Sequence, residues 1–160
     1  MDSDIRPLGA PGDLGWVVMA HGQAYADQFG WNQDFEALVC RIVADYDPAE
    51  GAAWIAEAAG ERVGCVFCVP GEEEGTAKLR ILLVLPQARG LGLGGALVDR
   101  CLEWAREAGY ERMALWTNDV LSSARRIYQA AGFKLVDEEP HHSFGHDLVG
   151  QYWARDLRPA

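Results

Sequence analysis

The chain is organised around the segment Leu85-Pro86-Gln87-Ala88-Arg89-Gly90-Leu91-Gly92-Leu93-Gly94. An apolar run, residues 79–85, leads into it, and helical spacing of apolar residues starts directly after it. The local order is therefore strand, proline stop, glycine-rich turn and helix. The glycines at 90, 92 and 94 remove the side chains that would keep a ligand away from the backbone. Amides of such a turn, next to a helix N-terminus, predict a pyrophosphate site.

The sequence of this turn can be compared with three known phosphate-binding motifs. The alternative to all three is an ordinary glycine-rich turn without a ligand. Gly90, Gly92 and Gly95 form a loose G-x-G-x-x-G, but no acidic residue ends a second strand about 20 residues later. A P-loop needs a lysine after its last glycine, and none follows here. Gln87-x-x-Gly90-x-Gly92, followed by residues 93–97, resembles the acetyl-CoA signature of the GNAT superfamily of N-acetyltransferases.

Composition limits the class of protein. The chain has 160 residues, 49% of them apolar, so we expect one domain over residues 1–160 with a substantial core. Its net charge of −10 argues against nucleic-acid and anionic-membrane partners and weakly favours a cationic amine substrate. There is no run of about 18 apolar residues. The first five residues lack the pattern of a signal peptide. We therefore expect a cytoplasmic protein.

The four cysteines include a Cys65-x-x-Cys68 pair, which suggests zinc or redox chemistry. Both residues fall in a predicted strand, 63–69, where residues three apart face opposite sides. No second pair of cysteines exists. We therefore expect buried, reduced thiols at Cys40, Cys65, Cys68 and Cys101.

The hydrophobic pattern predicts an α/β domain with a mixed sheet and helices on both of its faces. The expected strands are 5–8, 53–59, 63–69, 77–85, 113–117, 133–138 and 151–156, and the expected helices are 14–25, 35–46, 93–108 and 122–131. Asp13 is the expected N-cap of the first helix, and Gly60-Glu61-Arg62 is the expected turn of a hairpin.

This order of elements is also that of the GNAT fold, so the resemblance covers almost the whole chain and is weakest over the first 50 residues. It implies a single-domain acyl-CoA N-acyltransferase fold with a mixed, mostly antiparallel sheet of six to seven strands. Residues 115–119, 124–133 and 139–151 resemble the acetyltransferase half of bacterial proteins that fuse a MarR-type regulator to a GNAT domain. We expect no winged-helix regulator within these 160 residues.

The resemblance implies that acetyl-CoA is bound mainly by the backbone. The pyrophosphate would lie on the amides of Arg89, Gly90, Leu91, Gly92, Leu93, Gly94 and Gly95, with Gln87 in the signature and charge from Arg89. In GNAT proteins the strand before the turn separates from the next strand, which places Leu83, Val84 and Leu85 beside the pantetheine, with an oxyanion donor near Val84. Asn118 would contact the pantetheine, with a turn or N-cap role as its alternative, and Ser123 and Arg126 would approach the CoA.

Tyr128 matches the tyrosine that GNAT enzymes commonly use as the general acid for the leaving thiolate. It lies on the apolar face of its helix, so a core tyrosine is the alternative interpretation. Many GNAT enzymes carry a glutamate base on the strand before the turn, but residues 78–84 contain no carboxylate. A water chain or a more distant base is expected instead, with His142 as the tentative base or substrate contact and Glu57, His146 and Asp147 as further candidates.

The acceptor side of the site is less well defined. Residues 141–147 hold three of the four histidines, but their spacing does not suit a metal, so we expect a substrate-side loop that uses His141 and His146. The family likeness places Trp31 and Asn32 at the acceptor pocket, with a capping aromatic of the core as the alternative for Trp31. Arg80 alternates with Leu79 and Ile81, and it either meets a substrate carboxylate or lies at the sheet edge.

These observations predict an acetyl-CoA-dependent N-acetyltransferase without a metal, an acyltransferase that moves groups other than amino-acyl groups. The acceptor would be a primary amine of a small molecule or peptide, acetylated directly in a ternary complex. Because the strand carboxylate is missing, a non-catalytic acyl-CoA-binding sensor or regulatory module remains the alternative. A nucleotide-binding oxidoreductase is a third possibility. A homodimer is expected only because dimers are common in the fold.

Overall fold

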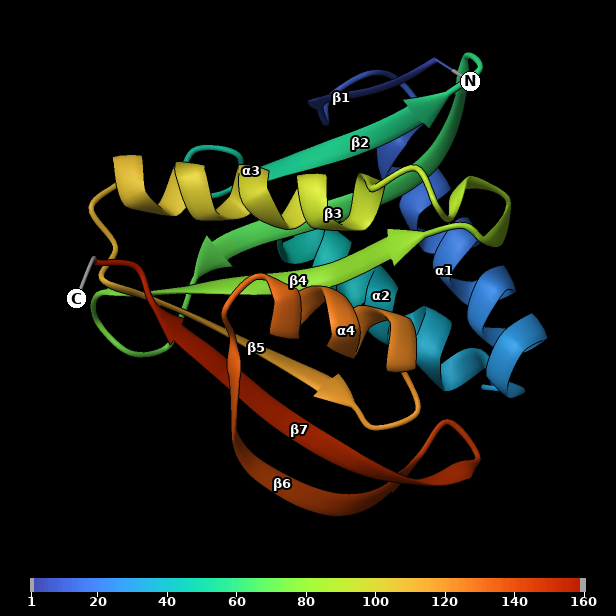
Figure 1. Cartoon of the computed structure of the whole chain (residues 1–160). Coiled ribbons are helices and arrows are strands. Elements are labelled where there is room, and N and C mark those ends of the chain that lie inside the picture. The colour runs from blue at the N-terminus through green and yellow to red at the C-terminus, as the bar shows by residue number, and fades with distance from the viewer. Residues whose placement is uncertain (1, 159–160) are drawn as a thin grey trace.

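A computed structural model describes residues 2–158. One seven-stranded sheet, in the order β1-β2-β3-β4-β5-β7-β6, runs through the molecule (Figure 1). Its strands are β1 (Ser3–Pro7), β2 (Ala52–Ala58), β3 (Glu61–Pro70), β4 (Thr76–Val84), β5 (Arg112–Asn118), β6 (Lys134–Ser143) and β7 (His146–Asp156). Only β4 and β5 pair in parallel, and the remaining pairs are antiparallel. The predicted mixed, mostly antiparallel sheet is confirmed.

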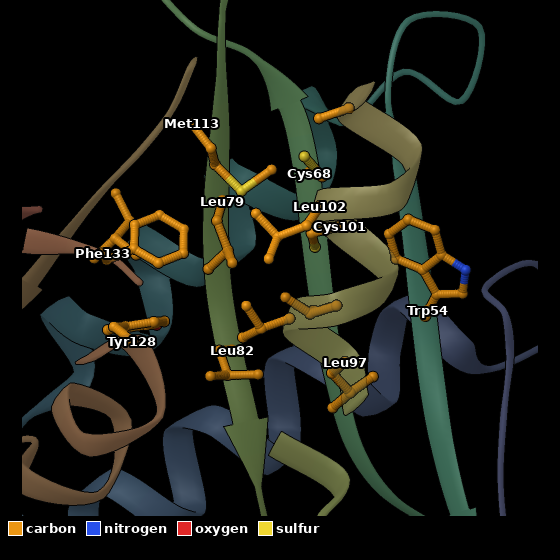
Figure 2. Packing of buried hydrophobic residues seen from close by; sticks show 14 of the residues in the cluster. Trp54, Cys68, Leu79, Leu82, Leu97, Cys101, Leu102, Met113, Tyr128 and Phe133 are labelled. Carbon is orange, nitrogen blue, oxygen red and sulfur yellow. The ribbon is translucent and has the colours of Figure 1, made fainter. Parts of the chain in front are cut away.

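Two pairs of helices cover opposite faces of the sheet. These are α1 (Asp13–Phe29) with α2 (Gln33–Asp45), and α3 (Leu93–Glu107) with α4 (Ser122–Ala130). Figure 1 shows α3 and α4 in front of the sheet and α1 and α2 behind it. In Figure 2, Leu97, Cys101 and Leu102 of α3 share one face of the sheet with Tyr128 and Phe133. On the opposite face, residues of α1 and α2 such as Val17, Phe35 and Val39 pack in a second core. The apolar stripes of the helices therefore bury both faces of the sheet.

The cysteines follow the strand alternation. Cys68 packs in the core beneath α3, and Cys65 packs in the core beneath α1 and α2. Burial raises the pKa of the thiols of Cys65 and Cys101, so both stay protonated. The expectation of a buried thiol is wrong for Cys40, which is exposed. Cys40 follows Val39 on α2 and is rotated off the apolar stripe that Val39 occupies.

Asp13 is not the N-cap of α1. Gly12 holds that position with a left-handed φ of 87°, and Asp13 is the first helical residue. The Asp13 carboxylate instead accepts hydrogen bonds from the amides of Gly9 and Ala10. It also accepts from the guanidinium groups of Arg6 and Arg62. These partners use up its oxygens, so none is left for the helix amides.

Strands β4 and β5 separate soon after they start. Their ladder pairs only Thr76, Ala77 and Lys78 of β4 with residues 112–114 of β5. The register between β3 and β4 shifts between Cys65 and Phe67, which gives β4 one additional residue at Ile81, where φ is +46°. Such a bulge bends the strand that contains it. The ends of the two arrows diverge in Figure 1.

Strands β6 and β7 form a longer hairpin than the sequence predicts. Residues 141–147, expected to be a substrate-side loop, instead belong to two strands and the tight turn at Phe144 and Gly145 that joins them. Both turn residues have positive φ, 58° and 85°, as in the turns that join twisted antiparallel strands directly. Most side chains of the edge strand β6 are exposed, so the strand lacks the apolar alternation by which strands are predicted.

Candidate active site

The glycine-rich turn forms one wall of the first cavity. A short 3-10 turn (Pro86–Ala88) follows β4, and the chain then reaches Gly92, whose φ of 74° starts α3. No side chain caps this helix end. The first intrahelical bond runs from the Ala96 amide to the Gly92 carbonyl. The amides at 93–95 therefore have no acceptor within the helix and are available to an anion.

The first cavity has a volume of about 650 Å³ and lies between the turn, α3, α4 and the end of β4. We call it the donor cavity. It is lined by most of the residues predicted to bind the cofactor, namely Leu83, Val84, Arg89, Gly90, Gly92, Leu93, Gly94, Gly95, Ser123 and Arg126. Leu85, Gln87 and Leu91 lie outside its lining, and Asn118 lines a second cavity. The Arg89 guanidinium donates to Gln28 Oε1 at 3.1 Å, at the mouth formed by α1.

Close packing of α3 and α4 shapes the floor of the donor cavity. A Cβ at Gly94 would lie 2.4 Å from Ile127 Cδ1 and 3.7 Å from Val84 Cγ2. Any larger residue at position 94 would force the end of the Ile127 side chain to move. The turn therefore uses Gly92 for its backbone conformation and Gly94 for helix packing.

The open edge of β4 faces the same cavity. The Leu85 amide donates to the Val63 carbonyl at 2.8 Å, so this amide points toward β3. Successive amides of a strand point to opposite sides. The Val84 amide therefore faces away from β3, into the gap that β5 has left.

A second cavity, of about 470 Å³, opens on the α1 and α2 face of the sheet. Its walls include four aromatic side chains: Tyr25, Trp31, Phe35 and Phe144. The rings of Tyr25 and Phe35 stack with centroids 4.6 Å apart, and those of Trp31 and Phe144 lie 4.9 Å apart. A cavity of this size with apolar walls suits a small ligand. We call it the acceptor cavity.

The sequence-predicted substrate residues divide into two groups. Trp31, Arg80 and His141 line the acceptor cavity. Asn32 and His146 join the α1–α2 loop to the β6–β7 hairpin: the Asn32 amide donates to the Phe144 carbonyl, and His146 Nε2 lies 3.1 Å from the Gly30 carbonyl. The Asn32 side chain also caps α2 by accepting from the Asp34 amide. This second group builds the rim of the cavity.

Asn118 and His141 form a polar wall inside the acceptor cavity. Asn118 Oδ1 accepts from His141 Nε2 at 2.7 Å, and His141 Nδ1 lies 2.8 Å from Ser143 Oγ. His142 points to the other side of β6, where its ring is exposed and binds Asp147 at 2.8 Å. Glu57 binds Arg6. None of Glu57, His142, His146 and Asp147, the candidate bases, lines the acceptor cavity.

The two cavities meet at the gap between β4 and β5. They share four lining residues, which are Tyr25, Leu82, Leu121 and Ala124. Tyr128, one turn beyond Ala124 on α4, lines the acceptor cavity and is 5% exposed. Its hydroxyl makes no hydrogen bond to the residues that the structure describes. Burial raises the pKa of Tyr128, so the phenol keeps its proton at neutral pH.

His21 lines the acceptor cavity and was not singled out from the sequence. Its Nδ1 lies 2.7 Å from the Val17 carbonyl, so Nδ1 carries the proton and Nε2 is left as an acceptor. Within residues 2–158, Nε2 is buried without a hydrogen-bond partner. Burial lowers the pKa of His21 to about 4, so the ring is neutral. The spacing of His21, Tyr25 and Phe29 on one helix face is the signal that could have revealed it.

Residues 18–133 match the model of the Acetyltransferase (GNAT) family. The chain belongs to the GNAT family. Its curated relatives include an uncharacterised N-acetyltransferase of Schizosaccharomyces pombe, 32% identical over 124 residues that cover 75% of this chain and 76% of the relative. Another is N-acetyltransferase family 8 member 2 of Rattus norvegicus, 35% identical over 103 residues, 62% of this chain and 46% of the relative. The chain thus spans about half the length of this longer relative.

Solved structures agree on the GNAT fold. A GNAT-family acetyltransferase from Staphylococcus aureus Mu50 matches with a TM-score of 0.81 at 19% identity, over 98% of this chain and all of the other. The yncA acetyltransferase of Salmonella typhimurium, solved with its cofactor acetyl-CoA, matches with a TM-score of 0.79 at 18% identity, over 100% of this chain and 96% of the other. Fold and family together make this GNAT protein an enzyme of the N-acetyltransferase class.

Residues 2–158 contain neither a candidate transmembrane helix nor a cluster of metal-binding side chains. No helix there combines the length and the apolar character needed to cross a membrane. No group of three or more His, Cys, Asp or Glu side chains in this range is placed to hold a metal ion.

Proposed function

We propose that this GNAT enzyme transfers the acetyl group of acetyl-CoA directly to the primary amine of a small molecule or peptide within a ternary complex. One observation carries the proposal: the donor and acceptor cavities share lining residues and meet at the gap between β4 and β5. Donor and acceptor can therefore be bound together and react through the gap. Direct transfer needs only that the reacting atoms be held in contact.

The donor cavity fits the parts of acetyl-CoA. The free amides at the start of α3 suit the pyrophosphate, and the guanidinium groups of Arg89 and Arg126 suit its negative charge. The exposed edge of β4 suits the pantetheine, whose amides can pair with a strand. A thioester that follows this edge brings its carbonyl oxygen toward the Val84 amide, which would stabilise the oxyanion. Ser123 would add a hydrogen bond from α4.

The residues at the gap account for the chemical step. The amine attacks the thioester carbonyl carbon, and the C–S bond of the tetrahedral intermediate then breaks. Tyr128 would donate its proton to the departing sulfur, and the phenolate then regains a proton from solvent. Because β4 carries no carboxylate and His142 lies outside the cavity, the proton from the amine would leave through water in the acceptor cavity. Asn118, His141 and Thr117 supply polar atoms for such water.

The test measures binding and turnover separately. Acetyl-CoA binding is followed by calorimetry, and thiol release is followed in the presence of a broad panel of primary amines. We expect binding of acetyl-CoA and amine-dependent thiol release matched by acetylated product. Binding without release for every amine would favour the alternative, an acyl-CoA sensor such as a module that works with a MarR-type regulator. NAD(P) binding in place of acetyl-CoA would point to an oxidoreductase.

A further inference from the structure

We propose that the acceptor is an amino acid with a large apolar side chain, and that Arg80 binds its carboxylate. The inference rests on the proposed function, because it names the substrate class of the same site. It depends on the placement of Arg80, on the charges around it and on the walls of the acceptor cavity.

Arg80 is a half-buried cation without a partner. Its side chain lines the acceptor cavity from β4. Within residues 2–158 it makes no side-chain hydrogen bond and no ion pair; the ion-paired basic side chains there are those of Arg6, Arg62, Lys78, His142 and Arg158. Burial lowers the pKa of Arg80, and the more distant Asp45 and Glu72 only partly oppose this. A guanidinium that has lost water and gained no anion is poised to bind one.

The charges that line the acceptor cavity favour an anion there, although the protein as a whole carries a charge of −10. Lys78 and Arg80 are the basic residues of the lining, and Glu139 is the acidic one. The Lys78 ammonium already lies 3.5 Å from the Glu72 carboxylate. Arg80 is therefore the cation of the described lining that remains free for a ligand.

Arg80 also stands at the place where the acceptor must react. It directly precedes Ile81, the residue of the β4 bulge, and both residues line the acceptor cavity. The last paired residues, Lys78 and Ala114, put Trp116 of β5 level with Arg80 on the same face of the sheet. A carboxylate on Arg80 thus lies at the start of the gap, so a nearby amino group is directed toward the thioester.

The remaining walls suit an apolar side chain. Trp31, Phe35 and Phe144 close one side of the cavity. Trp116 is 47% exposed and lies across Gly150, where a Cβ would come within 2.2 Å of its ring. An aromatic surface left open inside a binding cavity favours burial of an apolar group. Arg80 therefore favours a ligand with a carboxylate, and the aromatic walls favour a ligand with an apolar side chain.

The first experiment measures binding without turnover. Protein saturated with CoA is titrated with N-acetyl-L-phenylalanine and with N-acetylphenethylamine, which differ by the carboxylate. We expect the carboxylate ligand to bind on the order of a hundredfold more tightly. Arg80→Gln should abolish the difference and Arg80→Lys should keep part of it. Arg100→Gln, which removes an exposed charge on α3 outside both cavities, should leave the difference unchanged.

Equal binding of the two ligands to the native protein overturns the inference, whether or not the variants fold. So does an unchanged preference in an Arg80→Gln protein that still binds CoA. The second experiment measures thiol release with L-phenylalanine, L-phenylalaninamide and phenethylamine. A higher kcat/KM for phenethylamine than for phenylalanine overturns the substrate class but leaves acetyl transfer standing. Preferential binding of the carboxylate with no release from any amine supports the Arg80 site and contradicts the proposed function.

Discussion

Burial determines the chemistry of single side chains at this site, and Tyr128 is the clearest case. Its ring packs against Phe133 with centroids 5.9 Å apart, and its side chain lines the acceptor cavity. Its hydroxyl has no hydrogen-bond partner among the described residues. A structural tyrosine usually satisfies its hydroxyl. A phenol that keeps its proton and has no protein partner meets the requirements of the general acid that we propose.

Replacing Tyr128 by phenylalanine keeps the ring and removes the proton. We expect kcat to fall tenfold or more, because general acids contribute at least that much, with little change in acetyl-CoA affinity. Steady-state thiol release and calorimetry measure the two quantities. Tyr110→Phe, which removes a hydroxyl beside Trp104 outside both cavities, is the matched control. Unchanged turnover in Tyr128→Phe would remove Tyr128 from the mechanism.

His21 predicts how stability depends on pH. Its pKa is about 4 in the folded protein and 6.5 in the unfolded chain, because burial opposes the charged ring. Between these values the unfolded chain binds a proton that the folded protein does not, so stability falls as the pH drops from about 6.5 to 4. The loss attributable to His21 is about 3 kcal/mol at most.

Denaturant unfolding at a series of pH values measures this effect. His21→Phe retains ring packing against Tyr25 and Phe35 and does not titrate. It should lose most of the stability change between pH 6.5 and 4. If the free energy of unfolding changed with pH equally in the native protein and in the variant, His21 would be protonated equally in the folded and the unfolded state.

At the scale of elements, the β6–β7 hairpin closes the acceptor cavity. Phe144 sits in its turn with a φ of 58°, and its ring contacts Trp31 and Phe35 across the cavity. The turn also receives a hydrogen bond from the Asn32 amide. The hairpin and the α1–α2 loop therefore form one wall of the acceptor cavity, whereas the glycine-rich turn lines the donor cavity.

The substitution Phe144→Asn tests the aromatic ring of Phe144 separately from the backbone conformation of its turn. Asparagine tolerates a positive φ before glycine, so the hairpin should keep its turn and lose its aromatic contact. We expect the KM of the acceptor to rise roughly fivefold, while the affinity for acetyl-CoA stays unchanged, because a lost aromatic pair is worth about 1 kcal/mol. Initial rates at varied acceptor concentration measure this. A loss of donor affinity instead would mean that the hairpin supports both cavities.

At the scale of the whole molecule, Asp13 connects the start of the chain, β1 and α1, to the distant strand β3. Its carboxylate binds Arg6 of β1 at 2.8 Å and Arg62 of β3 at 2.9 Å, while Asp13 itself begins α1. Its side chain is 1% exposed, and these partners hold its pKa well below the usual range. The stabilisation is therefore present above about pH 4, the usual pKa of an aspartate, and is lost as the pH falls below it.

Asp13→Asn removes the charge and leaves two arginines facing a neutral amide. We expect the free energy of unfolding to fall by about 3 kcal/mol, because breaking a buried ion pair on one side is costly. Chemical denaturation at pH 7 measures the change. Asp27→Asn, an exposed position on α1, should change stability by less than about 0.5 kcal/mol. Similar values for the two variants would contradict the role given to Asp13.

A structural feature of this protein could be predicted from the sequence where residues close together in the chain determine it. The strand, turn and helix around Gly90 and Gly92 follow from the sequence, because proline, glycine and apolar spacing act over a few residues. The β6–β7 hairpin was predicted too short, because an exposed edge strand carries no apolar alternation. The role of Asp13 was predicted wrongly, because its partners Arg6 and Arg62 come from two other strands.

The sequence by itself determined the order of the elements, the mixed sheet and the glycine-rich backbone turn, since each follows from local conformational preference and helix or strand periodicity. Only the tertiary structure decided that Ile81 lies on the α1 and α2 side of the sheet, next to Arg80, because the bulge at Ile81 breaks the alternation that would put these two neighbours on opposite sides. The same holds for the meeting of the two cavities and for the unpartnered Nε2 of His21. These features depend on contacts between segments far apart in the chain, and such contacts form only when the elements pack.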